Sequence, residues 1–292
     1  MGRPVLYHYP ASFSSQIVRL ALVEKGVRWR SKIVDIIGAH AHYKPKYMEL
    51  NPNGVVPTLV HDQKEIIDCI AIAIYINNHF PGPHLIPTDE RRRDLMEQWV
   101  NLQQRFPERE LLYSMMSGTR ATIAHQDLER RKKTLKEAAN KHEELSDYYE
   151  AKYDDLSSLD RIIGSEAVAN KHQLTLRSMI DMLEEVMRKS TWLAGDEYSL
   201  ADVVWTVLLA RLDMLGLSKL WEDGGHPFVS GYYKSVKARP SFKKAKIYNR
   251  TPWSSYADAV LGRIPGARLV LRGIIIVIAG FALAQILKIV FA

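Results

Sequence analysis

Three serines crowd the start of a predicted helix near the beginning of the chain. Ser12, Ser14 and Ser15 lie in the stretch YPASFSSQIVRLALVEKG, residues 9–26, whose apolar periodicity predicts an amphipathic helix. A serine hydroxyl is among the preferred N-cap groups because it accepts a hydrogen bond from an unpaired backbone N–H. The same hydroxyl can stabilise the helix start and still face a ligand. The residues alone leave open whether one serine performs chemistry or all three cap the helix.

The composition argues against several other kinds of chemistry. The chain has 292 residues, of which 47% are hydrophobic and 25% charged, as expected for one or two globular domains with a core. A formal net charge of +7 favours anionic partners. Its basic runs, however, are typical of solvated helix faces, and no zinc-ligand spacing, phosphate-binding glycine loop or RNA-binding motif occurs. We therefore expect neither a nucleic acid partner nor a metal.

The cysteine content indicates a reducing compartment. The single cysteine, Cys69, cannot form an internal disulfide. No basic and apolar leader precedes Pro4, so nothing in the sequence argues for secretion. We expect the bulk of the chain to face the cytosol.

The first eighty residues alternate between strand and helix patterns. Strands are predicted at 5–9 and 28–36, a helix at 14–26, a hairpin from 51–62 with 65–68, and an apolar helix at 69–80. This order predicts a small mixed sheet with helices on its faces. The segment 81–90 is rich in proline and glycine and is interpreted as a linker. Residues 91–258 are predicted to be all-helical.

A highly charged insert, about residues 126–158, interrupts this helical part. Its apolar stripe is thin, consisting of Leu128, Leu135, Leu145 and Leu156. The pattern fits a solvent-exposed helix, or a projecting helical arm that meets a partner. Further along, Ser199 is followed by Asp202 before an apolar helix, which has the form of a capping box.

The end of the sequence has the composition of a membrane span. Residues 273–292, GIIIVIAGFALAQILKIVFA, would form about 30 Å of helix, which matches the hydrocarbon core of a bilayer. Arg263, Arg268 and Arg272 precede it, so the positive-inside rule keeps the folded part in the cytosol. We expect residues 259–292 to be a basic-flanked tail anchor with a transmembrane helix. A buried core helix is the alternative.

Three ordered motifs carry a resemblance to a known family. They are LYHYPASFSSQIVRLALVEKGV, LNPNGVVPTLV and WLAGDEYSLADV, and together they resemble the glutathione transferase (GST) superfamily. SFSSQ and the insert look like the tail-anchored ganglioside-induced differentiation-associated proteins of the mitochondrial outer membrane. ARPSFKKA and LLARLDMLGL look like the plant tetrachlorohydroquinone-dehalogenase-like class. The resemblance implies a thioredoxin-like α/β N-terminal domain, an all-α C-terminal domain and glutathione as co-substrate.

The resemblance also implies a set of site residues. Ser12 matches the catalytic serine, whose hydroxyl would stabilise the glutathione thiolate at the helix N-terminus. Val56 would precede a cis Pro57 and pair with the cysteinyl backbone of glutathione, as an added strand does. Asp68 and Cys69 stand where the family has an acid or amide followed by serine, which binds the γ-glutamyl group. A thiol is a weaker donor than a hydroxyl, so this departure weakens the expected site.

His42 is the last residue that the resemblance implicates. It lies nine residues before Asn51 and matches a histidine that approaches the glycyl carboxylate in several classes. A lone loop histidine is otherwise an ordinary surface residue.

Two functions of different classes follow from these patterns. One is a membrane-anchored glutathione transferase that activates the thiol for conjugation, peroxide reduction or dehalogenation of a hydrophobic electrophile. The other is a non-catalytic adaptor or redox sensor at an organelle membrane. A third function, a protein-import component of the metaxin type, rests on fold and membrane alone. The expected partners are glutathione, the electrophile and a lipid bilayer, and a homodimer is left open. Among membranes the mitochondrial outer membrane fits best, with other organelles and the plasma membrane left open.

Overall fold

The N-terminal part is a four-stranded sheet with helices on both faces. The computed structural model describes residues 2–248. The strand order is β2-β1-β3-β4, with β1 parallel to β2 and antiparallel to β3, and β3 antiparallel to β4. The strands are β1 (Val5–His8), β2 (Arg30–Ile33), β3 (Thr58–His61) and β4 (Lys64–Ile67). This is the mixed sheet that the sequence pattern predicted and the thioredoxin-like α/β arrangement that the resemblance implied.

Side chains along each strand alternate between the two faces of the sheet, and each face is covered by different helices. Leu6 and Leu59 point to the face covered by α1 (Phe13–Glu24) and α3 (Cys69–His79), and both are fully buried there. Tyr7 belongs to a separate cluster with Tyr47 of α2 (Pro45–Met48), on the opposite face. The sequence pattern missed α2 and the short 3₁₀ helix η1 (Ala41–Tyr43), which are too short to show a period.

The linker between the two parts passes very close to the end of α1. Gly82 has a φ of +119°, and a Cβ there would lie 2.3 Å from the carbonyl oxygen of Lys25. The Lys25 ammonium donates to the Gly82 carbonyl at 3.3 Å. Glycine is required at this position because any side chain would strain the backbone and collide with it.

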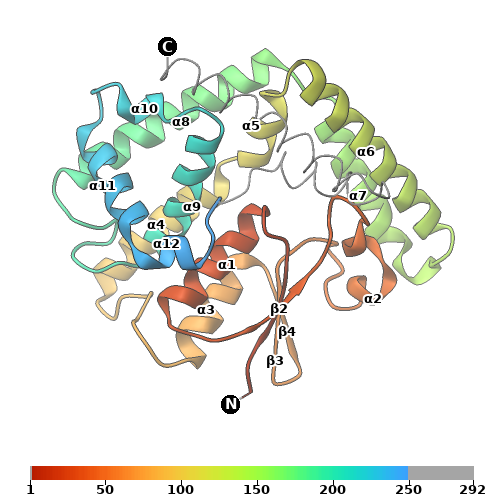
Figure 1. Cartoon of the computed structure of the whole chain (residues 1–292), viewed down its shortest axis with the longest axis horizontal. Coiled ribbons are helices and arrows are strands. Elements are labelled where there is room, and N and C mark those ends of the chain that lie inside the picture. Colours follow the sequence, from red (N-terminus) through yellow and green to blue (C-terminus); the bar gives the residue numbers. More distant parts are fainter. Residues whose placement is uncertain (1, 249–292) are drawn as a thin grey trace, which may run out of the picture. The chain divides into compact units, whose positions relative to one another are not determined.

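The rest of the described chain is all-helical (Figure 1). Its elements are α4 (Glu90–Arg105), α5 (Glu108–Ser114), α6 (Gly118–Ala139), η2 (Glu143–Leu145), α7 (Ser146–Asp160), α8 (Glu166–Met187), α9 (Leu200–Met214), α10 (Lys219–Glu222), α11 (Pro227–Ala238) and α12 (Pro240–Lys244). Helix α9 is the centre of the fold, because every residue from Leu200 to Leu212 is buried. It packs against both α4 and α1, so one hydrophobic core is shared by the sheet domain and the helical domain.

The predicted capping box lies at the start of α9. The Ser199 N–H donates to the Asp202 carboxylate at 2.8 Å, as the sequence predicted. The same carboxylate also accepts from the Leu193 N–H at 3.0 Å and from the Tyr232 hydroxyl at 2.9 Å. Burial raises the pKa of Asp202 to about 6 despite these donors. The box therefore fixes a loop and two helices, and it has a structural role.

The charged insert forms two helices, α6 and α7, that pack against each other and against the sheet domain. We call this pair the arm; Figure 1 shows it beside α2. Its apolar stripe is buried together with Tyr43 and Met48, and the Tyr149 hydroxyl donates to the Tyr43 carbonyl at 3.0 Å. Of the predicted stripe, Leu128, Leu135 and Leu156 are buried and Leu145 is half-buried; Tyr149 and Leu159 are buried in the same cluster. The thin stripe is thus explained by contacts within the chain, while the remaining faces of the arm are charged.

No helix within residues 2–248 is long and apolar enough to cross a bilayer. The predicted span, residues 273–292, lies outside the described residues, as does the rest of the predicted anchor.

Candidate functional site

Three segments of the sheet domain meet at one edge of the sheet. Tyr7 of β1 pairs with Thr58 of β3, and Thr58 pairs with Ile67 of β4. Because β1 and β4 both run antiparallel to β3, the residues after β1, before β3 and after β4 emerge at the same edge. These segments are residues 9–12, 55–57 and 68–69. The topology therefore brings together every residue of the predicted site except His42.

Ser12 is the N-cap residue of α1. Its backbone is extended, and its hydroxyl accepts from the Ser15 N–H at 3.3 Å. The Ser15 side chain is fully buried and accepts from the Tyr9 N–H at 3.4 Å, so it packs the loop from within. Ser12 itself is only half-buried. Its hydroxyl proton stays available for a ligand, because the cap bond uses the oxygen as acceptor.

The peptide bond between Val56 and Pro57 is cis, as the resemblance implied. Side-chain hydrogen bonds hold the turn that precedes this bond. The Tyr47 hydroxyl and the Asn51 amide both donate to the Val55 carbonyl, at 2.7 and 2.9 Å, and both also contact the Thr58 hydroxyl. Within the described residues, no hydrogen bond uses the N–H or C=O of Val56. This backbone is therefore free to pair with an extended peptide.

Asp68 and Cys69 begin α3. The Asp68 carboxylate accepts from the N–H groups of Ile70 and Ala71, both at 2.9 Å, in a residue with a φ of +71°. The Cys69 side chain is 5% exposed and lies in the hydrophobic core with residues of α1 and α3. Burial, followed by the charge of Asp68, raises the pKa of the Cys69 thiol to about 12. In this structure Asp68 is a helix cap and Cys69 a small core residue joining α3 to α1.

His42 lies under the arm. Its ring lies against the Tyr43 ring in a tilted contact, at 3.8 Å between ring centroids, and its side chain is 4% exposed. Burial lowers its pKa well below the ordinary value of 6.5, and the charge of Arg131 on α6 lowers it further. Its Nδ1 has no hydrogen-bond partner among the described residues. His42 is thus a neutral, buried histidine whose surroundings are set by the arm, which no sequence motif revealed.

A buried arginine near Ser12 was missed by the sequence motifs. Arg19 is 5% exposed and lies on α1 among apolar residues, with contacts to the carbonyls of Tyr9 and Pro10. The signal was present in the sequence: a charged residue interrupts the apolar run IVRLAL, where both helix faces are buried. Burial of a charge requires dedicated polar partners, so such a residue marks a structured polar contact.

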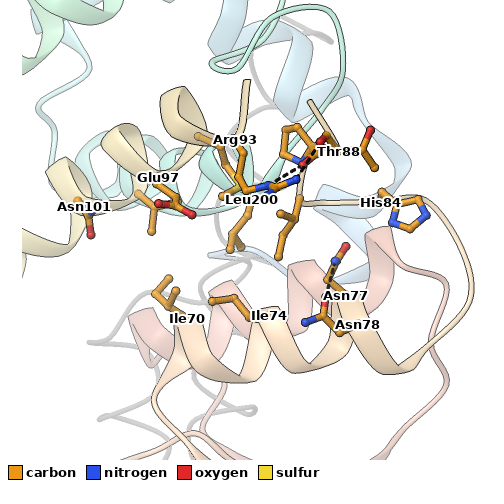
Figure 2. A pocket seen from close by; sticks show the side chains of 14 residues that line it. Ile70, Ile74, Asn77, Asn78, His84, Thr88, Arg93, Glu97, Asn101 and Leu200 are labelled. Atoms are coloured by element: carbon orange, nitrogen blue, oxygen red, sulfur yellow. Dashed lines mark hydrogen bonds between the residues drawn. The ribbon is translucent and has the colours of Figure 1, made fainter. Parts of the chain in front are cut away.

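A groove of about 600 Å³ lies elsewhere, between α3 and α4 (Figure 2). Ile70 and Ile74 form its apolar floor, with Glu97 and Asn101 on the opposite side. The Arg93 guanidinium at its edge is already bound to the carbonyls of Pro87 and Thr88. None of the predicted site residues lines this groove. Among residues 2–248, no group of three or more histidine, cysteine or acidic side chains could hold a metal.

Family models match both parts of the chain. Residues 6–84 match the model of the glutathione S-transferase N-terminal domain, and residues 155–240 match that of the C-terminal domain. A tetrachloro-p-hydroquinone reductive dehalogenase from Sphingobium chlorophenolicum is 30% identical over 245 residues, covering 83% of this chain and 95% of the relative. The chain belongs to the glutathione S-transferase family.

Two further GST-family relatives match the subgroups that the motifs suggested. The human ganglioside-induced differentiation-associated protein 1-like 1 is 31% identical over 274 residues, covering 82% of this chain and 72% of the relative. The glutathione S-transferase TCHQD of Arabidopsis thaliana is 28% identical over 255 residues, covering 87% and 94%. The family uses glutathione as a substrate.

Solved structures confirm the GST fold. The β-etherase LigF from Sphingobium sp. strain SYK-6 superposes with a TM-score of 0.65 at 20% identity, covering 84% of this chain and 98% of that one. Glutathione transferase F7 from Populus trichocarpa gives a TM-score of 0.62 at 20% identity, covering 83% and 97%. At this identity the likeness concerns the fold, and the chemistry has to be argued from the site.

Proposed function

We propose that the chain is a membrane-anchored glutathione transferase of the serine type. The observation that carries the proposal is the position of Ser12: a half-exposed hydroxyl at the N-terminus of α1, at the same sheet edge as the unpaired backbone of Val56. A thiol held there by the peptide backbone meets both a hydroxyl donor and the positive end of a helix dipole. Both favour the thiolate over the thiol.

The electrophile in this proposal is hydrophobic and carries a leaving group. The thiolate sulfur forms a bond to an electrophilic carbon, and a halide leaves with the bonding electron pair. Two dehalogenase relatives support a halogenated ring: the Sphingobium chlorophenolicum enzyme and a 2,5-dichlorohydroquinone reductive dechlorinase from Sphingobium indicum, which is 30% identical over 287 residues. Conjugation and peroxide reduction use the same activated thiolate.

Glutathione contacts beyond Ser12 complete the proposal. Val56 pairs with the cysteinyl backbone and Pro57 keeps that strand extended. At the start of α3, Asp68 meets the ammonium of the γ-glutamyl group, while the backbone N–H of Cys69 meets its carboxylate. To contact His42, the ligand reaches beneath the arm. The Nδ1 of His42, which has no hydrogen-bond partner among the described residues, then donates a hydrogen bond to the glycyl carboxylate.

Paired alanine variants test the role of Ser12. Ser165 caps α8 by accepting from the Val168 N–H at 3.4 Å, so it matches Ser12 in capping geometry and lies on another helix. We expect Ser12→Ala and Ser165→Ala each to lower the free energy of unfolding by about 0.5–2 kcal/mol. Only Ser12→Ala is expected to lower turnover per folded molecule, by about tenfold or 1.4 kcal/mol. Equal turnover in both variants would reduce Ser12 to a helix cap.

The second candidate is a non-catalytic adaptor, favoured by the inward-facing Cys69 and the arm that covers His42. Calorimetric titration of the detergent-solubilised full chain with glutathione separates the two. Saturable binding supports the transferase, and its absence supports the adaptor.

The membrane part of the proposal rests on residues 273–292. Their apolar length fits a bilayer and the preceding arginines keep the folded domains on the cytosolic side. The mitochondrial outer membrane is the proposed location. Alkaline carbonate extraction of cell membranes should leave the full chain in the pellet, and its release to the supernatant would contradict the anchor.

A further inference from the structure

Arg19 connects the loop that carries Ser12 to the end of the helical domain. On one side its guanidinium donates to the carbonyls of Pro10 and Tyr9, at 3.0 and 3.4 Å. On the other side it donates to the carbonyls of Ala245 and Lys246, at 2.9 and 3.3 Å. These two groups of carbonyls are more than 230 residues apart in sequence. One buried side chain thus joins the two domains next to residues 9–12, which we call the serine loop.

The charge of Arg19 has no carboxylate partner within the described residues. Burial lowers its pKa to about 10, so the guanidinium stays protonated at neutral pH. Its neighbour His8, with Nδ1 3.4 Å from Arg19, is neutral there, because burial and then the charges of Arg19 and Lys246 lower the pKa of His8 to about 4. The other arginine nearby, Arg211, is already paired with Glu108 at 3.1 Å. A net positive charge therefore remains behind the serine loop.

A second contact on the same helix strengthens this connection. Gln16, one turn before Arg19, accepts from the Tyr248 N–H at 2.7 Å through its side-chain oxygen. The Tyr248 ring lies 5.3 Å from the Arg211 guanidinium, which also lies 5.8 Å from the Phe13 ring. The first two turns of α1 therefore hold residues 245–248 and the serine loop in one packed unit.

We infer that Arg19 is a positioning residue for Ser12, fixing the serine loop against the helical domain and supplying a positive charge that favours the glutathione thiolate. The inference rests on the proposed function of this site. Arg19 lies two helical turns after Ser12, an axial rise of about 10 Å. Its guanidinium donates to the carbonyls of Tyr9 and Pro10, so it acts through the loop and through space rather than by touching the ligand. At an effective dielectric constant of about 20, a charge about 10 Å from the sulfur would shift thiol ionisation by about one pH unit.

Three variants of the full chain test this role. Arg19→Met removes both the charge and the forked contacts, whereas Arg19→Lys keeps the charge and loses the fork. Arg239→Met is the matched control, because Arg239 binds Glu24 at 2.8 and 2.7 Å and so joins the other end of α1 to the helical domain. The readouts are thermal stability, the pH midpoint of thiolate formation by bound glutathione from its ultraviolet absorbance, the split between kcat and KM, and amide exchange of residues 9–16 and 245–248.

All three variants should lose stability, but their other readouts should differ. For Arg19→Met we expect the midpoint to rise by about one pH unit, kcat to fall about tenfold and the KM for glutathione to change little. Arg19→Lys should keep the pH midpoint of thiolate formation and lose kcat. Arg239→Met should keep the wild-type midpoint and the wild-type kcat. Amide exchange should rise together at residues 9–16 and 245–248 in the two Arg19 variants only.

The result that overturns the inference is a loss of stability in Arg19→Met with an unchanged midpoint and kcat, which is the behaviour expected of the control. Failure of the proposed function looks different, because wild-type protein would then show no thiolate signal with glutathione. Amide exchange still decides the connection in that case: exchange confined to one of the two segments contradicts it.

Discussion

Acid destabilisation is expected to depend on His8, at the end of β1. This side chain is 5% exposed, and its Nε2 lies 2.7 Å from the Ser31 hydroxyl oxygen. Burial, then Arg19 and Lys246, lower its pKa from 6.5 to about 4 in the folded state. The unfolded chain therefore binds a proton more readily than the folded chain between about pH 6.5 and pH 4. Stability from His8 is complete above pH 6.5 and is lost as the pH falls through this window.

The expected loss of stability follows from the two pKa values of His8, 6.5 in the unfolded chain and about 4 in the folded one. Between about pH 7.5 and pH 5, the difference in proton binding at His8 costs about 2 kcal/mol of the free energy of unfolding. Asp202 works in the opposite direction, because burial raises its pKa from 3.8 to about 6, so the folded state gains about 1.4 kcal/mol of stability over the same interval. The two effects partly cancel in wild-type protein. A comparison with a variant is needed to isolate either one.

Chemical denaturation of His8→Gln at the two pH values isolates the histidine. Glutamine keeps a polar group near Ser31 and cannot take up a proton. We expect wild-type protein to lose about 2 kcal/mol more than His8→Gln on acidification. The control is His84→Gln, which makes the same substitution at an exposed side chain. Parallel pH curves for His8→Gln and wild type would show that the histidine is not held neutral by the fold.

Three further outcomes are expected from other parts of the structure. Tyr149→Phe should lower the free energy of unfolding by about 1–3 kcal/mol, since the Tyr43 carbonyl loses its buried donor. Amide exchange should also rise in η1, and unchanged exchange there would mean that the arm does not hold this loop. Cys69, the single cysteine, should resist iodoacetamide in native protein at neutral pH and react on unfolding, as measured by mass spectrometry. Rapid labelling of the native protein would contradict its burial. Gly82→Ala should lower the melting temperature more than Gly216→Ala, because both have positive φ but only Gly82 faces a backbone atom; equal losses would refute the close approach to Lys25.

Local patterns in the sequence were enough to predict the strands and the two longer helices of the sheet domain. The alternation in VLYHY, the helical period after Ser12 and the hairpin before Cys69 are short-range signals that survive in the structure as β1, α1, β3, β4 and α3. Ser199 and Asp202 likewise form the predicted contact, because a capping box involves residues only three apart. The motif order also led to the right family.

Only the tertiary structure decided the surroundings of the site. The arm packs on η1, which carries His42, Arg19 donates to the carbonyls of residues 245 and 246, and Cys69 is buried in the core with residues of α1. Each of these contacts joins segments far apart in the chain, and a period or motif describes only near neighbours. The charge pattern of the insert left open what its thin apolar stripe would meet, because burial depends on which surface a helix meets. The sequence by itself therefore determined the elements and the family, whereas the packing of distant segments determined which side chains at the site are buried, neutral or free.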